Sequence, residues 1–124
     1  MFADRLATVM IPAHDLARAL RWYEEKLGLK PSRADDNGAS FELQGAHAFL
    51  YKSEFAGSAK STMLSFASPD LVADMAALRQ RGVSFIDYDL PGLKTVNGLA
   101  EFGPMKNAWA KDSEGNILAF VEGM

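Results

Sequence analysis

The stretch LATVMIPAHDLARALRWYEEKLGL, residues 6–29, changes from a strand pattern to a helix pattern and decides the fold. Residues 6–11 are apolar and include β-branched side chains, which predicts a buried strand. Asp15 then supplies a helix-capping carboxylate, and Gly28 is typical of a helix end. Between them, one amphipathic helix face is formed by Leu16, Leu20, Tyr23 and Leu27.

Three short strands are predicted after this helix, at hairpin spacing. They are expected at residues 29–33, 40–43 and 46–52, with tight turns between them. The next segment, residues 54–61, contains Gly and Ser and is expected to be a linker.

The same order of elements then starts again. Residues 62–67 predict a strand, and Ser68-Pro69-Asp70 predicts a helix start with Ser68 as the N-cap. Gly82 is expected to end that helix. Four further strands are expected at residues 83–88, 99–102, 108–112 and 117–122.

This internal repeat predicts an α+β fold made of two tandem βαβββ modules that share a core. The whole chain, residues 1–124, is expected to form a single domain. Module one covers about residues 5–53, the linker about 54–61 and module two about 62–122.

Composition excludes several classes of protein. A length of 124 residues with 48% hydrophobic residues suits one domain with a real core. The net charge of −3 and the scattered Lys and Arg residues provide no basic surface for nucleic acid or an anionic membrane. Since the chain has no Cys, disulfides, thiolate metal sites and cysteine nucleophiles are excluded. With no signal-peptide pattern and no long apolar run, a cytoplasmic protein is expected.

Two motifs at opposite ends of the chain resemble those of a known family. Residues 11–29 carry a strand that runs into Asp-Leu, followed by an aromatic-Tyr pair before Leu-Gly. Residues 108–118 contain an Asp-x-x-Gly-Asn turn in a closing hairpin. The chain therefore resembles the vicinal oxygen chelate superfamily of glyoxalases, bleomycin resistance proteins and extradiol dioxygenases. Both motifs carry the fold and not an activity.

The resemblance implies that each module curls its strands, so that the two modules form a curved mixed sheet around a cleft. It also implies a homodimer, often with each cleft built from modules of different chains. Metal-dependent members place a His, Glu or Gln ligand on the first and the last strand of each module.

At those ligand positions this chain has poor metal ligands. The first-strand positions fall on Thr8 and near Thr62, and the last-strand position of module two falls on Ala119. The corresponding position of module one lies within residues 49–51, which contain neither imidazole nor carboxylate. Zinc, nickel and iron sites need such donors, so no metal and no other cofactor are expected.

Other polar residues give no catalytic constellation. His14 is expected to be a partly exposed capping residue, and His47 an exposed strand residue. Glu42 and Glu122 are the strand carboxylates nearest a cleft, and solvated edge positions are expected for them. Since there is no phosphate loop and no nucleophile elbow, catalytic residues cannot be assigned.

Strand alternation predicts which side chains face the cleft. If Thr8 faces it, Leu6 and Met10 do too, while residues 7, 9 and 11 pack under the helix. The same reasoning places Leu64 and Phe66 with Thr62, and residues 117 and 121 with Ala119. The predicted ligand-binding residues are Thr8, Met10, Phe41, Tyr51, Thr62, Phe66, Met105, Trp109 and Ala119. Such an apolar wall suits a planar or hydrophobic organic molecule.

Residues 87–107 predict a long loop with two Pro-Gly or Gly-Pro pairs. Because long loops in small domains are commonly functional, we expect it to form a mobile flap over the cleft.

Three functions are consistent with the sequence. The leading hypothesis is a homodimeric protein that binds a small hydrophobic or aromatic molecule without a metal. The alternative is an enzyme of the same superfamily, a metal-dependent lyase, isomerase or dioxygenase with unconventional ligands. The third is a structural or regulatory dimer without a ligand. It predicts a cleft filled by Phe41, Phe66, Trp109 and Met10.

Overall fold

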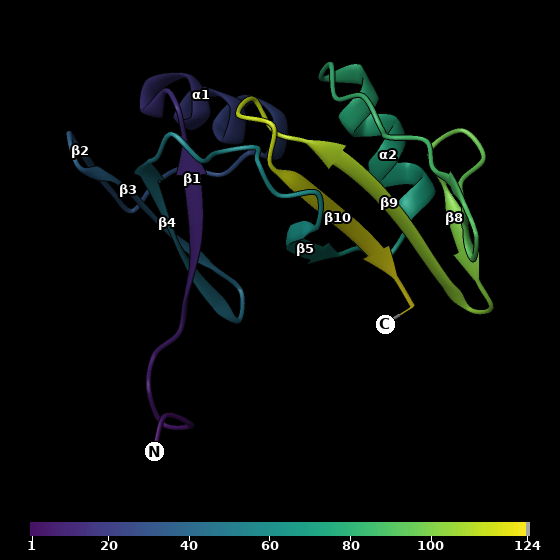
Figure 1. The fold of residues 1–124 in the computed structure, drawn as a ribbon, viewed down its shortest axis with the longest axis horizontal. Helices are drawn as coiled ribbons and strands as arrows, with labels where there is room; N and C mark the ends of the chain where they lie inside the picture. The colour runs from purple at the N-terminus through teal and green to yellow at the C-terminus, as the bar shows by residue number, and fades with distance from the viewer. Residues whose placement is uncertain (124) are drawn as a thin grey trace.

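Module one is a four-stranded sheet with one helix against it, seen at the left of Figure 1. The computed structural model describes residues 1–123. The sheet has the order β1-β4-β3-β2, with β1 parallel to β4 and the other pairs antiparallel. Its elements are β1 (Thr8–Ala13), α1 (Leu16–Leu27), β2 (Arg33–Asp35), β3 (Gly38–Leu43) and β4 (Ala46–Lys52).

Module two repeats this topology with one insertion. Its sheet has the order β5-β10-β9-β8, and β5 runs parallel to β10. A small hairpin, β6 (Asp89–Leu90) and β7 (Leu93–Lys94), lies between helix α2 and β8. The main elements are β5 (Thr62–Ala67), α2 (Leu71–Gln80), β8 (Ala100–Phe102), β9 (Met105–Lys111) and β10 (Ile117–Glu122). The predicted α+β fold of two tandem βαβββ modules is confirmed.

Helix α1 forms where the sequence predicts it. The Asp15 side chain accepts a hydrogen bond from the Arg18 backbone N–H, and Gly28 ends the helix with a φ of 70°. Its buried Tyr23 packs over the sheet against Phe41, with ring centroids 6.2 Å apart. Ile11 of β1 packs in the same core. Its neighbour Met10 points to the opposite face of the strand, as strand alternation predicts.

Helix α2 begins later than predicted. Its N-cap is Asp70, whose side chain accepts from the Ala73 backbone N–H, so the prediction of Ser68 as N-cap is wrong. The Ser68 hydroxyl instead lies 2.5 Å from an Asp74 carboxylate oxygen. Neither helix within residues 1–123 is long and apolar enough to cross a membrane.

The predicted strand at residues 83–88 is not regular. Phe85 forms an isolated bridge with Ala110, and the Ile86 backbone N–H bonds to the Trp109 carbonyl. Beyond this point the chain leaves the sheet edge for the β6–β7 hairpin. The segment therefore touches β9 without continuing along it.

The segment expected to form a flap is packed. Buried Thr95 places its hydroxyl 2.8 Å from both the Asp87 carboxylate and the Tyr88 backbone nitrogen. The backbone N–H of Gly98 also donates to Asp87, and this bond together with the Thr95 hydroxyl lowers the pKa of the carboxyl. These bonds close the loop on itself and argue against a flap.

A β-bulge in β5 changes which side chains face the helix. Ile117 pairs with Thr62, but the next residue, Leu118, pairs with Leu64, so one residue of β5 is extra. Leu64 and Phe66 consequently point toward the helix side, where Phe66 stacks on Phe120 with centroids 6.0 Å apart. The prediction that Leu64 and Phe66 share a face with Thr62 is wrong for this reason.

The two modules are joined by a set of hydrogen-bonded polar residues that we call the junction cluster. It consists of four buried residues and the exposed Arg18: Tyr23, Asp112, Glu114, Asn116 and Arg18. The Tyr23 hydroxyl donates to Asp112 over 2.6 Å, and burial and this carboxylate raise the pKa of Tyr23. The Asn116 amide donates to Asp112 and to the Pro12 carbonyl of module one, at 2.9 and 2.8 Å.

Glu114 is the charged member of the junction cluster that reaches helix α1. Its carboxylate lies 2.8 and 3.0 Å from two Arg18 nitrogens and 2.9 Å from the Asp15 backbone nitrogen. Burial raises the pKa of Glu114, but Arg18 and the donated hydrogen bonds outweigh it and lower the pKa to about 2. This carboxylate therefore stays ionised and holds the modules together at neutral pH.

The segment between the modules packs on the junction cluster. The Gly57 backbone N–H donates to Asn116 over 3.0 Å, and a Cβ on Gly57 would lie 2.4 Å from the Glu114 carbonyl oxygen. His14, expected as a capping residue, instead places a ring nitrogen 2.9 Å from the Ala56 carbonyl oxygen.

Candidate functional site

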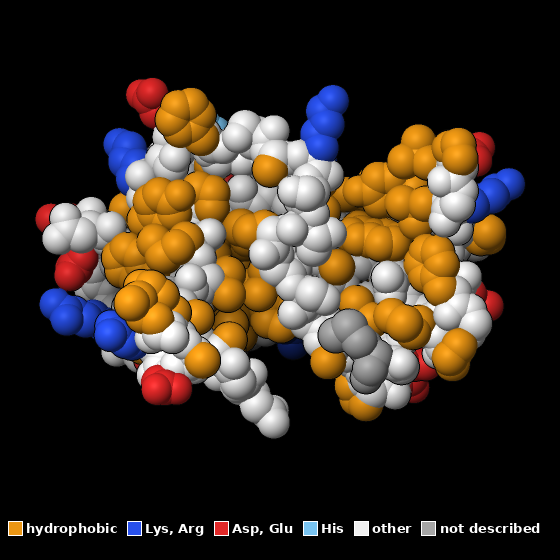
Figure 2. Space-filling view, turned by 60° about the horizontal axis from the view of Figure 1, so that its bottom comes forward, with side chains coloured by type: hydrophobic (Ala, Val, Ile, Leu, Met, Phe, Trp, Pro, Cys, Tyr) orange, Lys and Arg blue, Asp and Glu red, His pale blue; other side chains and the backbone are white. Residues whose placement is uncertain are grey.

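Each sheet has one face that its helix does not cover, and we call these the open faces. The module-one open face is formed by Thr8, Met10, Ser40, Glu42, His47, Phe49 and Tyr51. The module-two open face is formed by Thr62, Ser65, Met105, Asn107, Trp109, Ile117, Ala119 and Val121. Figure 2 looks from below the view of Figure 1 and shows apolar side chains gathered on both sides of a hollow.

The module-one open face carries a cavity of about 350 Å³. Thr8 and Met10, both predicted to bind the ligand, line it together with Phe49. Tyr51 lies farther along the same face, opposite Pro12. The residues that line this cavity all belong to module one, so the module-two open face does not close it.

A row of polar residues crosses the module-one open face. The strand register pairs Thr8 with His47 and His47 with Glu42, on β1, β4 and β3 respectively. His47 Nδ1 lies 2.5 Å from Glu42 Oε2, with side-chain exposures of 41% and 59%. Two separate solvated residues were expected from the sequence, because the strand register that places them beside Thr8 could not be derived from it.

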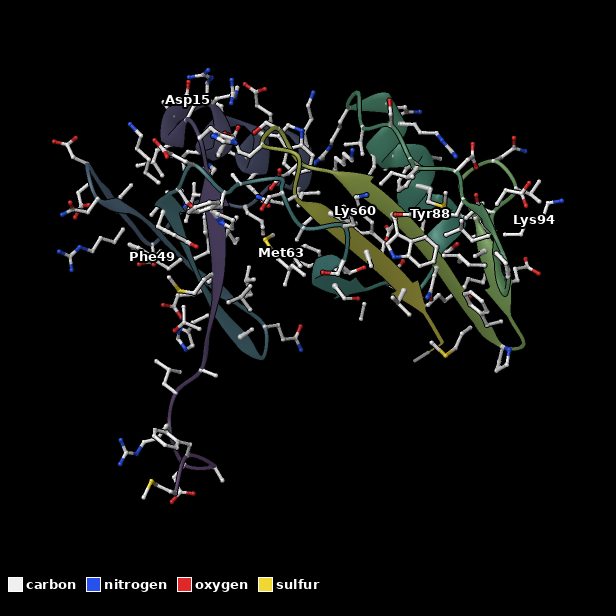
Figure 3. All side chains as sticks on the ribbon, in the orientation of Figure 1. Asp15, Phe49, Lys60, Met63, Tyr88 and Lys94 are labelled. Atoms are coloured by element: carbon white, nitrogen blue, oxygen red, sulfur yellow. The ribbon has the colours of Figure 1, made fainter. Side chains whose placement is uncertain are left out.

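The module-two open face is built around an aromatic pair. Trp109 pairs across the strands with Ala119, and the Tyr88 ring meets Trp109 edge-on with centroids 5.3 Å apart. Figure 3 shows Tyr88 over β9 and Met63 between the two sheets. The side-chain oxygen of Asn107 is buried here and has no hydrogen-bond partner within residues 1–123. Tyr88 and Asn107 were not predicted as site residues. Tyr88 ends the strand predicted at residues 83–88, which is irregular in the structure, and Asn107 lies just before the strand predicted at residues 108–112.

Most of the predicted ligand-binding residues lie on the open faces. Thr8, Met10 and Tyr51 belong to module one, and Thr62, Met105, Trp109 and Ala119 to module two. Phe66 lies on the helix side of β5, so its placement is wrong. Phe41 is among the residues that line the module-one cavity, but its side chain is buried under α1 against Tyr23.

Phe66 lines a different cavity, of about 300 Å³, between the two helices. Its floor includes Phe120, and its rim carries Lys26 and Arg81. Each of these cations donates to a backbone carbonyl of the other, Lys26 at 2.5 Å and Arg81 at 3.2 Å. Because they neutralise two helix C-termini, their role there is structural.

The residues at the expected ligand positions do not fit a divalent metal. Thr8, Thr62 and Ala119 offer hydroxyl and methyl groups, and the open-face residues of the fourth position are Phe49 and Tyr51. Within residues 1–123 there is no group of three or more His, Cys, Asp or Glu side chains that could hold a metal ion. Glu122, the remaining candidate carboxylate, accepts the backbone N–H of Leu71 on the helix side.

Comparison with known proteins agrees with this architecture. The model of the Glyoxalase/Bleomycin resistance protein/Dioxygenase superfamily matches residues 5–120. Comparison with curated protein sequences gives no match.

Solved structures with the same fold share little sequence with this chain. A glyoxalase/bleomycin resistance protein/dioxygenase from Alicyclobacillus acidocaldarius is 20% identical, with a TM-score of 0.72 over 96% of this chain and 91% of that one. A glyoxalase/bleomycin resistance protein from Catenulispora acidiphila is 20% identical, with a TM-score of 0.70 over 96% and 98%. TnmS3, an antibiotic binding protein from Streptomyces sp. CB03234, is 19% identical, with a TM-score of 0.68 over 98% of both chains.

Proposed function

The chain belongs to the Glyoxalase/Bleomycin resistance protein/Dioxygenase superfamily, and we propose that it binds a small hydrophobic or aromatic molecule between its open faces without a metal or other cofactor. One observation carries the proposal. Where metal-dependent members are expected to have a carboxylate, Ala119 lies beside Trp109, which Tyr88 meets edge-on. An aromatic pair beside a methyl group favours a planar apolar ligand and cannot coordinate an ion.

The fold neighbours support small-molecule binding. TnmS3 is an antibiotic binding protein, and its structure aligns with 98% of this chain and 98% of its own. The buried, unpartnered oxygen of Asn107 lies on the module-two open face, where a ligand or a second chain could donate a hydrogen bond to it.

We propose further that a second copy of the chain completes the site. The accessible surface is 7920 Å². A compact monomer of this mass exposes about 6,500 Å², so this chain exposes more total surface than is expected of a closed monomer. Leu6 and Met10 are 72% and 49% exposed beside the module-one cavity. An obligate dimer would cover such residues and place a second open face opposite them.

The other functions have less support. A metal-dependent lyase, isomerase or dioxygenase needs ligands that Thr8, Thr62 and Ala119 do not provide. A dimer without a ligand was expected to have its cleft filled by four apolar side chains. Two of those, Phe41 and Phe66, lie on the helix sides instead, and a cavity is present on the module-one open face.

The test is native mass spectrometry and metal analysis of freshly purified protein. We expect twice the chain mass, less than stoichiometric metal, and binding of added aromatic molecules at one or two per dimer. One tightly held divalent ion per chain, whose removal by a chelator abolishes binding, would refute the proposal. A monomer at micromolar concentration would refute the shared site.

A further inference from the structure

We propose that the row Thr8–His47–Glu42 recognises an acidic hydroxyl group, such as that of a phenol, on the bound aromatic molecule. This inference rests on the proposed function and names the polar contact that an otherwise apolar site makes. The three residues are neighbours on β1, β4 and β3, and they line one cavity.

The short contact fixes where the imidazole carries its proton. His47 Nδ1 and Glu42 Oε2 lie 2.5 Å apart, a separation that requires a proton between a ring nitrogen and a carboxylate oxygen. In the neutral ring this leaves Nε2 as an acceptor. His47 and Thr8 both line the cavity, and the contact with Glu42 uses only Nδ1 of the ring, so Nε2 is available to a ligand beside the Thr8 hydroxyl.

The surroundings of the row make such a contact selective. Leu6, Met10 and Phe49 line the same cavity, so a bound aromatic ring would exclude water around the imidazole. A hydrogen bond formed in this apolar setting discriminates more strongly than one formed in water. An exposed hydrogen bond between two strand side chains contributes little stability, so a structural role is a weak reason for placing these residues here.

Charge narrows the class of ligand. Within residues 1–123, the charged side chain that pairs with the His47 ring is that of Glu42, which is an anion. A ligand carboxylate or phosphate placed beside the imidazole would meet that negative charge, whereas a neutral hydroxyl donates to Nε2 without penalty. The row therefore favours hydroxylated aromatic molecules over aromatic acids and over aromatic molecules without a donor.

The experiment uses two probes, 2-naphthol and 2-methoxynaphthalene, and titrates each into the full-length protein by calorimetry. Wild type is expected to bind 2-naphthol about ten-fold more tightly, because one hydrogen bond is added. His47→Phe is expected to bind both probes with equal affinity, and Glu42→Gln to lose most of the preference. Glu101→Gln, a substitution of an exposed residue on β8, serves as the matched control. This variant should keep the wild-type preference for 2-naphthol.

The outcomes separate the two proposals. Equal wild-type affinity for both probes, or an unchanged preference in a folded His47→Phe protein, would overturn the recognition site and leave the proposed function standing. Failure to bind either probe would overturn both. Because His47 and Glu42 are exposed strand residues, we expect melting temperatures of the variants close to that of wild type.

Discussion

The junction cluster and the open faces use polar groups in opposite ways. In the junction cluster, Asp112 is buried and accepts four hydrogen bonds, from Tyr23, from the Asn116 amide and from the backbone N–H groups of Glu114 and Asn116. On the open faces, the oxygen of Asn107 has no partner within residues 1–123, and Met10 is half-exposed. Satisfied polar groups thus hold the modules together, while the polar group that lacks a partner lies on the surface that we propose binds the ligand.

The difference explains why the sequence motifs identify a family and not an activity. Asp15 and Tyr23 of the first motif, and Asp112 and Asn116 of the second, all lie at the junction of the modules. Changes there should lower stability, and changes on the open faces should lower binding.

The largest effect is expected from Asp112→Ala. The substitution leaves the buried Tyr23 hydroxyl and two backbone N–H groups without an acceptor. We expect the free energy of unfolding to fall by about 3–5 kcal/mol, measured by urea denaturation. Asp36→Ala, in the exposed β2–β3 turn, should change it by less than about 0.5 kcal/mol. Equal effects of the two changes would remove the distinction between junction and surface.

A smaller loss of stability is expected when the pH is lowered. The folded pKa of Glu114 is about 2, below the ordinary 4.5, so the folded protein binds this proton less readily than the unfolded chain. Its contribution is complete above pH 4.5 and is lost as the pH falls toward 2. We expect a loss of about 1–3 kcal/mol over this range, and Glu114→Gln should flatten the profile there. An unchanged profile would show that Glu114 does not couple the modules.

Trp109→Leu should change binding more than stability. Removing the ring deletes the stacking surface of the module-two open face, and we expect naphthyl probes to bind about ten-fold more weakly. Trp22→Leu, in helix α1 of module one and away from both open faces, is the matched control and should leave probe affinity unchanged. Equal losses in both variants would show that the open face does not form the site.

The sequence predicted the module order and one open face because both follow from local periodicity. On β1 the alternation of Thr8 and Met10 with the buried residues holds throughout. On β5 it fails, since the bulge at residues 62–64 has no Gly or Pro to signal it. The burial of Phe41 under α1 and the contact of His47 with Glu42 were not predicted for a related reason: strand pairing sets which residues meet across a sheet, and pairing is not encoded in any one strand.

The most direct test of the account measures 2-naphthol affinity before and after exhaustive dialysis against EDTA, with the metal content determined in parallel. If the open faces bind aromatic molecules through apolar and hydrogen-bonding contacts alone, the dissociation constant stays the same within about two-fold. A loss of binding that one equivalent of a divalent ion restores would contradict the account.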